Sequence, residues 1–437
     1  MEMAFWGQTR KNAAEYEPLP SSDSADSGEI ETLLPQHKSR ALGVRKVVTN
    51  LGWIAVFGTA LMVTTFLVLY VYESTGLAFI DPFKGNGNST ESATKWVEEL
   101  SPLVTPVMCH SHNDYLRRHP LFSALSVGCA SVEADVWLSK DGKDLLVAHH
   151  RWGLSSKKTL RSLYIDPLLQ ILDSINTPAS QNNPVFDGHP SGVFSTHPNT
   201  TLILFIDVKD DPAKTWPVVL EQLTPLRDHE YLSRHEKIPS ATTNQSFWPG
   251  PITVVGTGNI VNRRDVNIGA DPERWHQYHD VFLDSSLDLL DKPGFCQTND
   301  SLCLGVQENE FYTASVSFWR AIGTVITGFS ALQLKTLQHQ IHTAKKLGLK
   351  SRYWELPSWP ISYRDYVWGV IDREGIDLLN ADDVYSAATR HWETGHPRDM
   401  VWIVVDFALT DENGESERSD LGLDDTANAR YRKSRSG

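Results

Sequence analysis

Hydrophobic and polar residues divide the chain into distinct regions. The first fifty residues are mostly polar, and the stretch from Ser21 to Glu31 is rich in Ser, Asp, Glu and Gly. Such a segment cannot bury enough apolar surface to fold, so residues 1–50 are predicted to be a disordered tail. Residues 51–72 contain no charged residue, and a linker over 73–100 leads into a long region of alternating apolar runs.

The run from Leu51 to Tyr72 has the length of a transmembrane helix. At about 1.5 Å per residue it spans roughly the 30 Å of a bilayer core. Trp53 lies near one end and Tyr70 near the other, where aromatic rings prefer the headgroup region. A buried core helix rarely stays apolar on every face, and a cleaved signal peptide has a shorter apolar region nearer the N-terminus. We therefore predict a transmembrane helix over residues 51–72.

Short apolar runs alternate with helical patterns from about Leu103 onward. The expected strands are Val104–Met108, Ser131–Trp137, Leu202–Val208, Ile252–Val255, Val281–Leu283, Phe311–Val316, Ser351–Trp354 and Asp377–Leu379, with a hairpin arm at Leu145–Ala148. The clearest helix runs from Ala331 to Leu347 and ends at Gly348. Repeated strand–helix units predict a parallel sheet covered by helices, and about eight strands suit a closed (β/α)8 TIM-type barrel. We expect this barrel over 101–395, followed by a largely disordered extension over 396–437.

The orientation across the membrane follows from the flanking charges. Basic residues precede the span and mostly acidic residues follow it: Lys38, Arg40, Arg45 and Lys46 before, Glu73 and Asp81 after, with only Lys84 nearby. All glycosylation acceptor motifs, Asn-x-Ser/Thr, lie after the span, at Asn88, Asn199, Asn244 and Asn299. Both features predict a single-pass type II protein whose N-terminus is cytosolic and whose barrel is lumenal or extracellular.

Two further features concern the compartment. The segment Glu29–Leu34 resembles the acidic dileucine sorting signal of endosome- and vacuole-directed membrane proteins, or it is a chance match in an acidic tail. The glycosylation motifs and the charge bias favour the endomembrane system or vacuole over the mitochondrion. Cys296 and Cys303 flank a short polar loop and can pair in an oxidising lumen. Cys109 and Cys129 lie in apolar strand-like segments, where a buried free thiol is the expected state and a disulfide between them the alternative.

Net charge limits the class of ligand. The formal net charge is −14, which argues against a nucleic-acid partner, because phosphate backbones recruit Lys and Arg. It leaves a phosphate-containing substrate open, since a bound divalent cation can reverse the local field.

Polar residues gather where the predicted strands end, which is where a (β/α) barrel places its active site. These groups are His110-Ser111-His112-Asn113-Asp114, Glu133-x-Asp135, His149-His150 and Asp207-x-Lys209. Alternate residues of a strand point the same way, so Glu133, Asp135 and Asp207 are expected to share one barrel mouth. Three carboxylates there repel one another strongly without a cation, and oxygen ligands suit Mg²⁺ or Ca²⁺.

The alternative for each motif is structural. A Glu-x-Asp pair is commonly the solvated face of a strand, and Asp-x-Lys is commonly a surface ion pair worth under about 1 kcal/mol. The functional interpretation depends on the coincidence of four such groups, each at the end of an apolar run, within one repeating architecture. In it, the cation stabilises charge on a reacting phosphate, two histidines transfer protons, and Lys209 neutralises a phosphate oxygen.

The motifs together resemble a fungal family called altered inheritance of mitochondria protein 6, of the phospholipase-C-like phosphodiesterase superfamily. They are His110-Ser-His-Asn-Asp, Ser131-Val-Glu133-Ala-Asp135-Val-Trp, Leu145-Leu-Val-Ala-His149, Phe205-Ile-Asp207-Val-Lys209, Arg352-Tyr-Trp-Glu355-Leu-Pro and Leu379-Asn380-Ala-Asp382-Asp383. The resemblance covers roughly residues 100–390.

The resemblance implies roles for individual residues. His110 and His149 would be the acid/base pair, and Glu133, Asp135 and Asp207 the metal ligands. The Asp207-x-Lys209 form is similar to the sphingomyelinase D branch. Glycerophosphodiesterases instead carry Glu at the first of these positions, His-Arg-Gly at the first motif, and Asp where this chain has His150, so the substrate stays open.

Three functions are therefore compared. The first is a metal-dependent phosphodiesterase acting on a phospholipid or glycerophosphodiester, with Trp354, Glu355, Asn380 and Asp382 shaping the pocket and Asp383 shaping it or capping the next helix. The second is an amidohydrolase that uses His110-x-His112, which needs further zinc-binding histidines that are not found after Val255 or Leu283. The third is a catalytically inactive barrel that binds lipid or protein.

Overall fold

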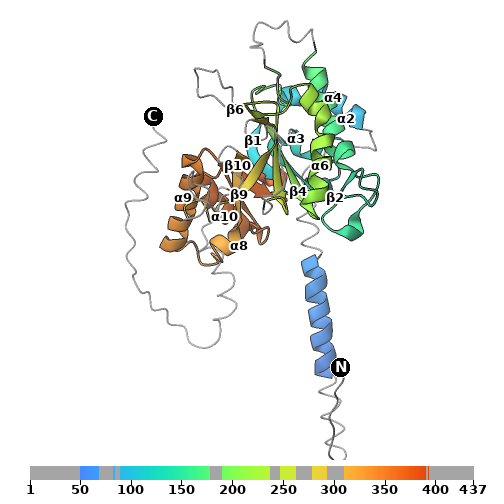
Figure 1. Ribbon diagram of the computed structural model, residues 1–437. Helices are drawn as coiled ribbons and strands as arrows, with labels where there is room; N and C mark the ends of the chain where they lie inside the picture. Colours follow the sequence, from blue (N-terminus) through green and yellow to red (C-terminus); the bar gives the residue numbers. More distant parts are fainter. Residues whose placement is uncertain are drawn as a thin grey trace, which may run out of the picture. The chain divides into compact units, whose positions relative to one another are not determined.

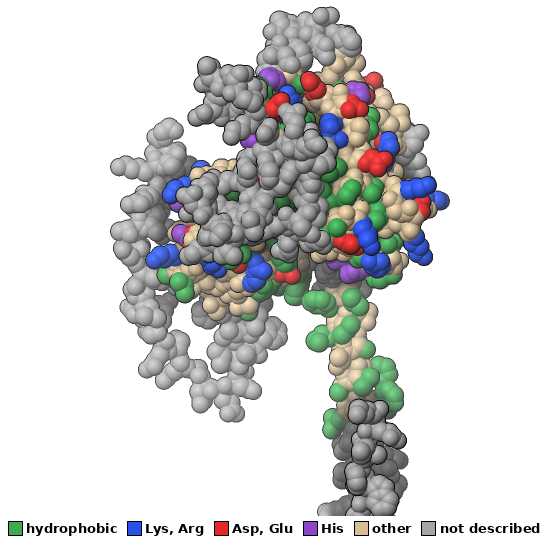
Figure 2. All heavy atoms as spheres, viewed as in Figure 1, with side chains coloured by type: hydrophobic (Ala, Val, Ile, Leu, Met, Phe, Trp, Pro, Cys, Tyr) green, Lys and Arg blue, Asp and Glu red, His purple; other side chains and the backbone are tan. Residues whose placement is uncertain are grey.

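The computed structural model describes residues 50–67, 82–83, 89–177, 189–236, 247–261, 278–292, 310–389 and 392. The chain divides into two compact units, Met1–Val68 and Leu69–Gly437, which are considered separately. In the first unit the described residues form one helix, Asn50–Leu67, which by length and composition is apolar enough to cross a membrane. Its side chains are exposed, and Figure 2 shows hydrophobic groups along it. Residues 68–72 of the predicted span lie outside the described residues.

The second unit contains a closed barrel of parallel strands (Figure 1). Its strands are β1 (Val107–Ser111), β2 (Cys129–Leu138), β4 (Leu202–Val208), β7 (Ile252–Gly258), β9 (Phe282–Ser286), β10 (Phe311–Ser317), β11 (Lys350–Trp354) and β12 (Leu378–Ala381). The sheet closes because β1 pairs in parallel with both β2 and β12. The hairpin arm β3 (Leu145–Val147) runs antiparallel to β2. The predicted TIM-type barrel is confirmed.

Helices and a small second sheet surround the barrel. The helices are α2 (Ser89–Lys95), α3 (Phe122–Ser126), α4 (Asp166–Ile175), α6 (Pro212–Gln222), α7 (Thr224–Asp228), α8 (Phe318–Ala321), α9 (Ala331–Lys346), α10 (Ile361–Arg373) and α11 (Val384–Thr389). The second sheet contains β5 (Arg234–Glu236), β6 (Phe247–Trp248) and β8 (Tyr278–His279).

Helix α9 shows why the predicted helix forms where it does. Ser330 and Gln333 make a reciprocal capping box at its start. Leu337, Ile341 and Ala344 recur at helical spacing and are buried against the barrel. The chain leaves the helix at Gly348, whose φ of +73° favours glycine.

Strand β4 shows how alternation builds the barrel interior. Leu202, Leu204 and Ile206 belong to the large core under the helices. Ile203 and Phe205 point the other way and pack with Val255 and Leu378 inside the barrel. Asp207 continues this inward series one step beyond Phe205, so its carboxylate lies above the apolar floor.

The predicted position of the first strand was wrong by three residues. The sequence suggested Val104–Met108, whereas β1 is Val107–Ser111. Pro106 lacks a backbone N–H, and the strand begins after it. His110 and Ser111 pair in register with Asn380 and Ala381 of β12, so these polar residues belong to the strand itself.

The expected free thiols were also wrong. Cys109 and Cys129 form a disulfide with a Cα–Cα distance of 4.9 Å. Parallel pairing of β1 with β2, in which Val107 lies opposite Cys129, brings the two side chains to the same outer face. Cys296 and Cys303 lie outside the described residues.

Candidate active site

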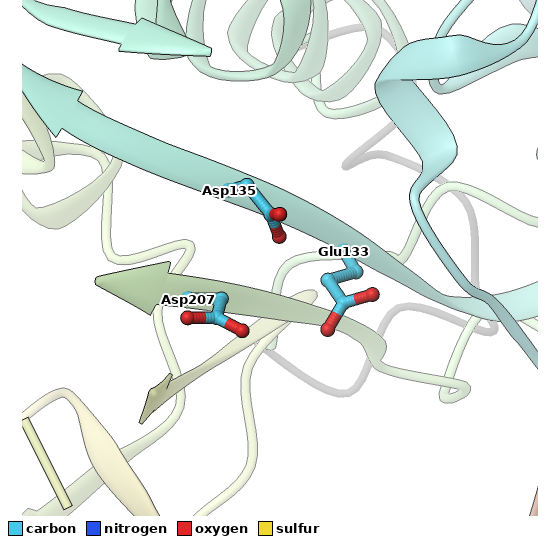
Figure 3. Close-up of side chains that lie close together, drawn as sticks. All are labelled: Glu133, Asp135 and Asp207. Atoms are coloured by element: carbon cyan, nitrogen blue, oxygen red, sulfur yellow. The ribbon is translucent and has the colours of Figure 1, made fainter. Parts of the chain in front are cut away.

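Three carboxylates meet at the mouth of the barrel (Figure 3). Glu133 and Asp135 come from β2 and Asp207 from the adjacent β4, where Asp135 and Asp207 are register partners. One carboxylate oxygen of each lies within 4.8 Å of the others. Strand alternation predicted this meeting, because residues two apart on β2 point to the same side.

Burial and nearby charges shift the pKa values of the three carboxylates. Burial raises the pKa of Asp207 to about 6, and repulsion from Glu133 and Asp135 adds to the rise despite the attraction of Lys209. Burial and Glu133 likewise raise the pKa of Asp135. Burial opposes ionisation of Glu133 too, but the imidazoles of His110 and His112 and the guanidinium of Arg352 lower its pKa well below the ordinary value.

The donor set fits a hard divalent cation. Lys209 Nζ lies 2.8 Å from Asp207 Oδ2 and 3.0 Å from Asp135 Oδ2, so it neutralises part of the negative charge of these two carboxylates. In the described part of the chain, however, the second oxygens of Asp135 and Asp207 are buried without a hydrogen-bond partner. Buried oxygens without partners cost free energy, and carboxylate oxygens are the ligands that Mg²⁺ and Ca²⁺ prefer.

His149 is held directly against this cluster. It follows β3, and its Nδ1 lies 3.0 Å from Asp135 Oδ2. Tyr115, on the turn after β1, donates its hydroxyl to the same Asp135 oxygen at 2.7 Å. Because the two ring nitrogens lie on opposite edges of an imidazole, this contact directs Nε2 of the exposed His149 away from the carboxylate.

His110 lies deeper than the sequence suggested. Its side chain is fully buried, with Nδ1 2.7 Å from Ser131 Oγ and Nε2 2.9 Å from Arg352 Nη1. Burial, together with the positive charge of Arg352, lowers its pKa to about 4. The ring therefore contributes a neutral hydrogen-bonding group to the floor of the mouth.

His112 instead faces an open pocket beside the cluster. This pocket has a volume of about 400 Å³ and is lined by His112, Asn113, Leu116, Arg117, Glu355, Trp359, Arg364, Asp382 and neighbouring residues. His112 Nδ1 lies 2.8 Å from Asp382 Oδ1, and its Nε2 lies 3.8 Å from Glu133 Oε2. Although burial opposes protonation, Asp382 and Glu133 raise the pKa of His112.

Several expected pocket residues have distinct places. Glu355, Asn380 and Asp382 line the pocket. Asn380 also reaches the barrel interior, where its Oδ1 accepts from Arg352 at 3.1 Å. Asp383 lines the pocket but also accepts from the backbone N–H of Ser386, so it caps α11 as the structural alternative predicted.

Sequence reasoning missed a polar network beneath the cluster. Arg352 is buried between His110, Asp284 and Ser315, with its guanidinium 4.5 Å from the centre of the Phe205 ring. Asp284 accepts hydrogen bonds from Thr313 and Ser315. The sequence offered one signal for this network, the charge of Arg352 within a predicted barrel strand. A charged side chain inside a barrel faces no solvent, so it needs buried polar partners.

The chain is similar in sequence to known proteins. Residues 98–284 match a model described as the AIM6-like phosphodiesterase domain. "Altered inheritance of mitochondria protein 6 homolog" of Arthroderma benhamiae is 37% identical over 295 residues, which cover 65% of this chain and 83% of that protein. "Altered inheritance of mitochondria protein 6" of Eremothecium gossypii is 34% identical over 303 residues, covering 68% of this chain and 72% of the relative.

Among solved structures, a glycerophosphodiester phosphodiesterase from Agrobacterium tumefaciens aligns with 13% identity and a TM-score of 0.32, covering 65% of this chain and 99% of its own. The barrel and the matched model together define the class, a phosphodiesterase-type domain. The chain belongs to the altered inheritance of mitochondria protein 6 family.

Proposed function

We propose that this protein is a membrane-anchored, metal-dependent phosphodiesterase acting on a phospholipid or glycerophosphodiester. The observation that carries the proposal is the cluster of Glu133, Asp135 and Asp207 beside a histidine and an open pocket, with buried oxygens that have no hydrogen-bond partner among the described residues. A phosphodiester brings negative charge, which this acidic mouth accepts only together with a cation.

Each residue of the mouth has a defined task. Glu133, Asp135 and Asp207 would hold Mg²⁺ or Ca²⁺, which supplies positive charge for a phosphoryl oxygen. Lys209, whose pKa is raised by Asp207 and Asp135 although burial opposes the rise, stays charged and pairs with a second phosphate oxygen. The pocket receives the group attached to the phosphate.

Two histidines flank the place where the phosphate would bind. Asp135 fixes the ring of His149 through Nδ1, and Nε2 transfers a proton to or from a reacting oxygen. The family resemblance assigns the partner role to His110. Because His110 is fully buried whereas His112 lines the pocket, the geometry favours His112 for contact with the substrate and His110 for supporting the floor.

The anchor and the compartment belong to the same proposal. The helix Asn50–Leu67 would hold the barrel close to its lipid substrate and raise the effective concentration of each for the other. The charge bias around this helix supports an N-terminus in the cytosol and a barrel in the lumen of the endomembrane system or vacuole, or outside the cell.

The test is hydrolysis by the purified full-length chain. With Mg²⁺ or Ca²⁺ it should release p-nitrophenol from bis(p-nitrophenyl) phosphate or alcohol from glycerophosphodiesters. Glu133→Gln removes one negative ligand and should lower the rate by at least about a hundredfold, because loss of a residue that only supports a ligand already costs about ten- to a hundredfold. The matched control is Asp141→Asn, a carboxylate in the exposed turn between β2 and β3, which should keep full activity.

Each outcome separates the competing functions. A fully active Glu133→Gln variant would remove the metal role. Zinc in the purified protein, measured by elemental analysis, would favour an amidohydrolase. Calorimetry that detects no metal binding to the wild-type chain would favour a binding module.

A further inference from the structure

Exposed tryptophans surround the mouth of the barrel. In the described barrel residues, Trp152, Trp319 and Trp359 have the most exposed indole rings. Each lies in a segment that follows the end of a barrel or arm strand: Trp152 after β3, Trp319 in α8 after β10, and Trp359 after β11. Loops that follow parallel strands all emerge at the same end of a barrel, the end that holds the carboxylates, and this places Trp319 and Trp359 there. Trp152 follows the antiparallel strand β3 and lies at this end because its ring is next to His150, whose ring neighbours His149 beside Asp135.

The same end carries further exposed aliphatic side chains. Leu116 follows β1 and lines the pocket beside Trp359. Ile326 lies in the connection from α8 to α9, where the backbone N–H of its neighbour Val325 is 3.4 Å from the Tyr363 hydroxyl. We call Leu116, Trp152, Trp319, Ile326 and Trp359 the rim.

The rim is continuous with the candidate site. Trp152 is 5.6 Å from the His150 ring, and His150 is 4.3 Å from His149, measured between ring centres. His149 in turn contacts Asp135. A surface that covered the rim would therefore deliver its own molecules to the pocket and the carboxylates.

The side chains of the rim and of its neighbours indicate what kind of surface covers the rim. Indole rings favour the boundary between lipid tails and headgroups, and basic residues beside them favour anionic headgroups. The loop after β3 supplies this combination, since Arg151, Lys157 and Lys158 are exposed close in sequence to Trp152. Arg151 packs over the Trp137 ring at 4.6 Å, which orders the base of that loop.

The segment between the apolar helix and the barrel is short enough to keep the barrel near a membrane that holds the helix. Residues 68–88 separate the apolar helix from α2. Fully extended, such a segment spans at most about 75 Å, so a helix inserted in a membrane confines the barrel to its vicinity.

We propose that the rim docks on the surface of an anionic bilayer and that a lipid headgroup enters the pocket directly from it. The substrate part of this inference rests on the proposed phosphodiesterase function, whereas docking itself is independent of turnover. Binding that depends on both apolar insertion and headgroup charge distinguishes this surface from a contact with another protein.

The experiment uses the full-length chain in nanodiscs, with hydrogen exchange followed by mass spectrometry. Nanodiscs of phosphatidylcholine alone are compared with nanodiscs that also contain phosphatidylserine. The test variant is Trp152→Ser with Trp319→Ser, whose side chains are 87% and 42% exposed. The matched control is Leu103→Ser with Leu347→Ser, 80% and 42% exposed, because Leu103 precedes β1 and Leu347 follows α9 at the opposite end of the barrel.

We expect the segments around Trp152 and Trp319 to exchange more slowly on anionic nanodiscs. The test variant should lose this protection by about tenfold, equivalent to about 1.4 kcal/mol of docking free energy, while the control keeps it. Equal exchange of the wild-type rim on the two nanodiscs would overturn the proposal and leave a protein contact as the use of this surface.

Activity gives a second readout that separates docking from catalysis. On lipid presented in vesicles the test variant should be slower by a similar factor, whereas on soluble bis(p-nitrophenyl) phosphate it should match the wild type. A chain that docks but hydrolyses neither substrate would contradict the proposed function and leave the docking surface standing. Equal loss on both substrates would contradict the docking role.

Discussion

At the scale of single residues, Asp207 depends on a glycine of the neighbouring strand. Gly258 ends β7 with a φ of +70°, where residues with a Cβ are strained. A Cβ built there would overlap Asp207 Oδ1, a buried oxygen to which no described residue donates a hydrogen bond, and approach the Val208 carbonyl at 2.8 Å. The glycine therefore leaves space for the carboxylate at the mouth.

Gly258→Ala should weaken binding of Mg²⁺ or Ca²⁺ by about tenfold or more, because the displaced Asp207 loses its place beside Asp135. Calorimetric titration of the full-length protein measures this. Gly142→Ala is the matched control, since Gly142 has a φ of +71° but an added Cβ there meets no atom of the described residues within 4 Å. Both variants bear a similar backbone strain of about 1 kcal/mol, and only the first should lose affinity. Equal affinities would contradict this role for Gly258.

The carboxylates of the site could be predicted from the sequence, but the contacts of the residues around them could not. Glu133, Asp135 and Asp207 were predictable because strand alternation and register follow from a local pattern. The depth of His110 was not, because it depends on Arg352, which is 242 residues away in sequence and whose Nη1 lies 2.9 Å from the His110 ring. Tertiary contacts of this kind have no local signature, so His112, two residues later, could not be distinguished from His110 by spacing.

At the scale of elements, the disulfide joins the two strands that close the barrel. Cys109 on β1 and Cys129 on β2 are 20 residues apart in sequence, and both side chains are buried. β1 pairs with only a few residues of β2, and their register shifts between Val107 and His110. The covalent link therefore holds a short and irregular part of the seam.

Replacing both cysteines, Cys109→Ser with Cys129→Ser, should lower the free energy of unfolding by about 3 kcal/mol. A loop of this length releases that much denatured-state entropy when its link is removed. Urea denaturation of the full-length protein in detergent gives the value. Reductant should destabilise the wild type by a similar amount and leave the double variant unchanged. Free thiols at both positions in alkylated wild-type protein would show instead that the bond does not form.

The predicted strands show what periodicity determines and where it fails. β4 was predicted with its observed bounds because its run of apolar residues is buried on both faces. β1 was misplaced because its last two residues, His110 and Ser111, are polar and resemble the start of a loop. The inside of a barrel mouth is polar, so strands that build a site are less apolar there than those that build only the core.

At the scale of the whole molecule, the order of strands around the barrel followed from their order in sequence. A repeated strand–helix pattern places each strand beside the previous one with a single handedness, so closure needed only a correct count. The second sheet, formed by β5, β6 and β8, was not predicted. Its strands have only two or three residues and carry no detectable alternation.

The orientation across the membrane can be tested at Asn199. This residue is exposed in the described loop before β4, and its motif Asn199-Thr200-Thr201 accepts a glycan only in the secretory lumen. In yeast-expressed protein, Asn199→Gln should run one glycan smaller on gels, and enzymatic deglycosylation should remove that difference. Thr201→Ser preserves the acceptor motif and should behave as wild type.

A barrel on the cytosolic side would leave all these proteins unshifted by deglycosylation. It would also place the Cys109–Cys129 bond in a reducing compartment, where structural disulfides are rare. The charge bias, the glycan acceptor and the disulfide are thus three features that all fit a barrel on the non-cytosolic side. Each has a different physical cause, so they test the topology independently. If the glycan is absent while the cysteines are oxidised, the barrel faces an oxidising space outside the glycosylation pathway, and the charge argument for a lumenal barrel fails.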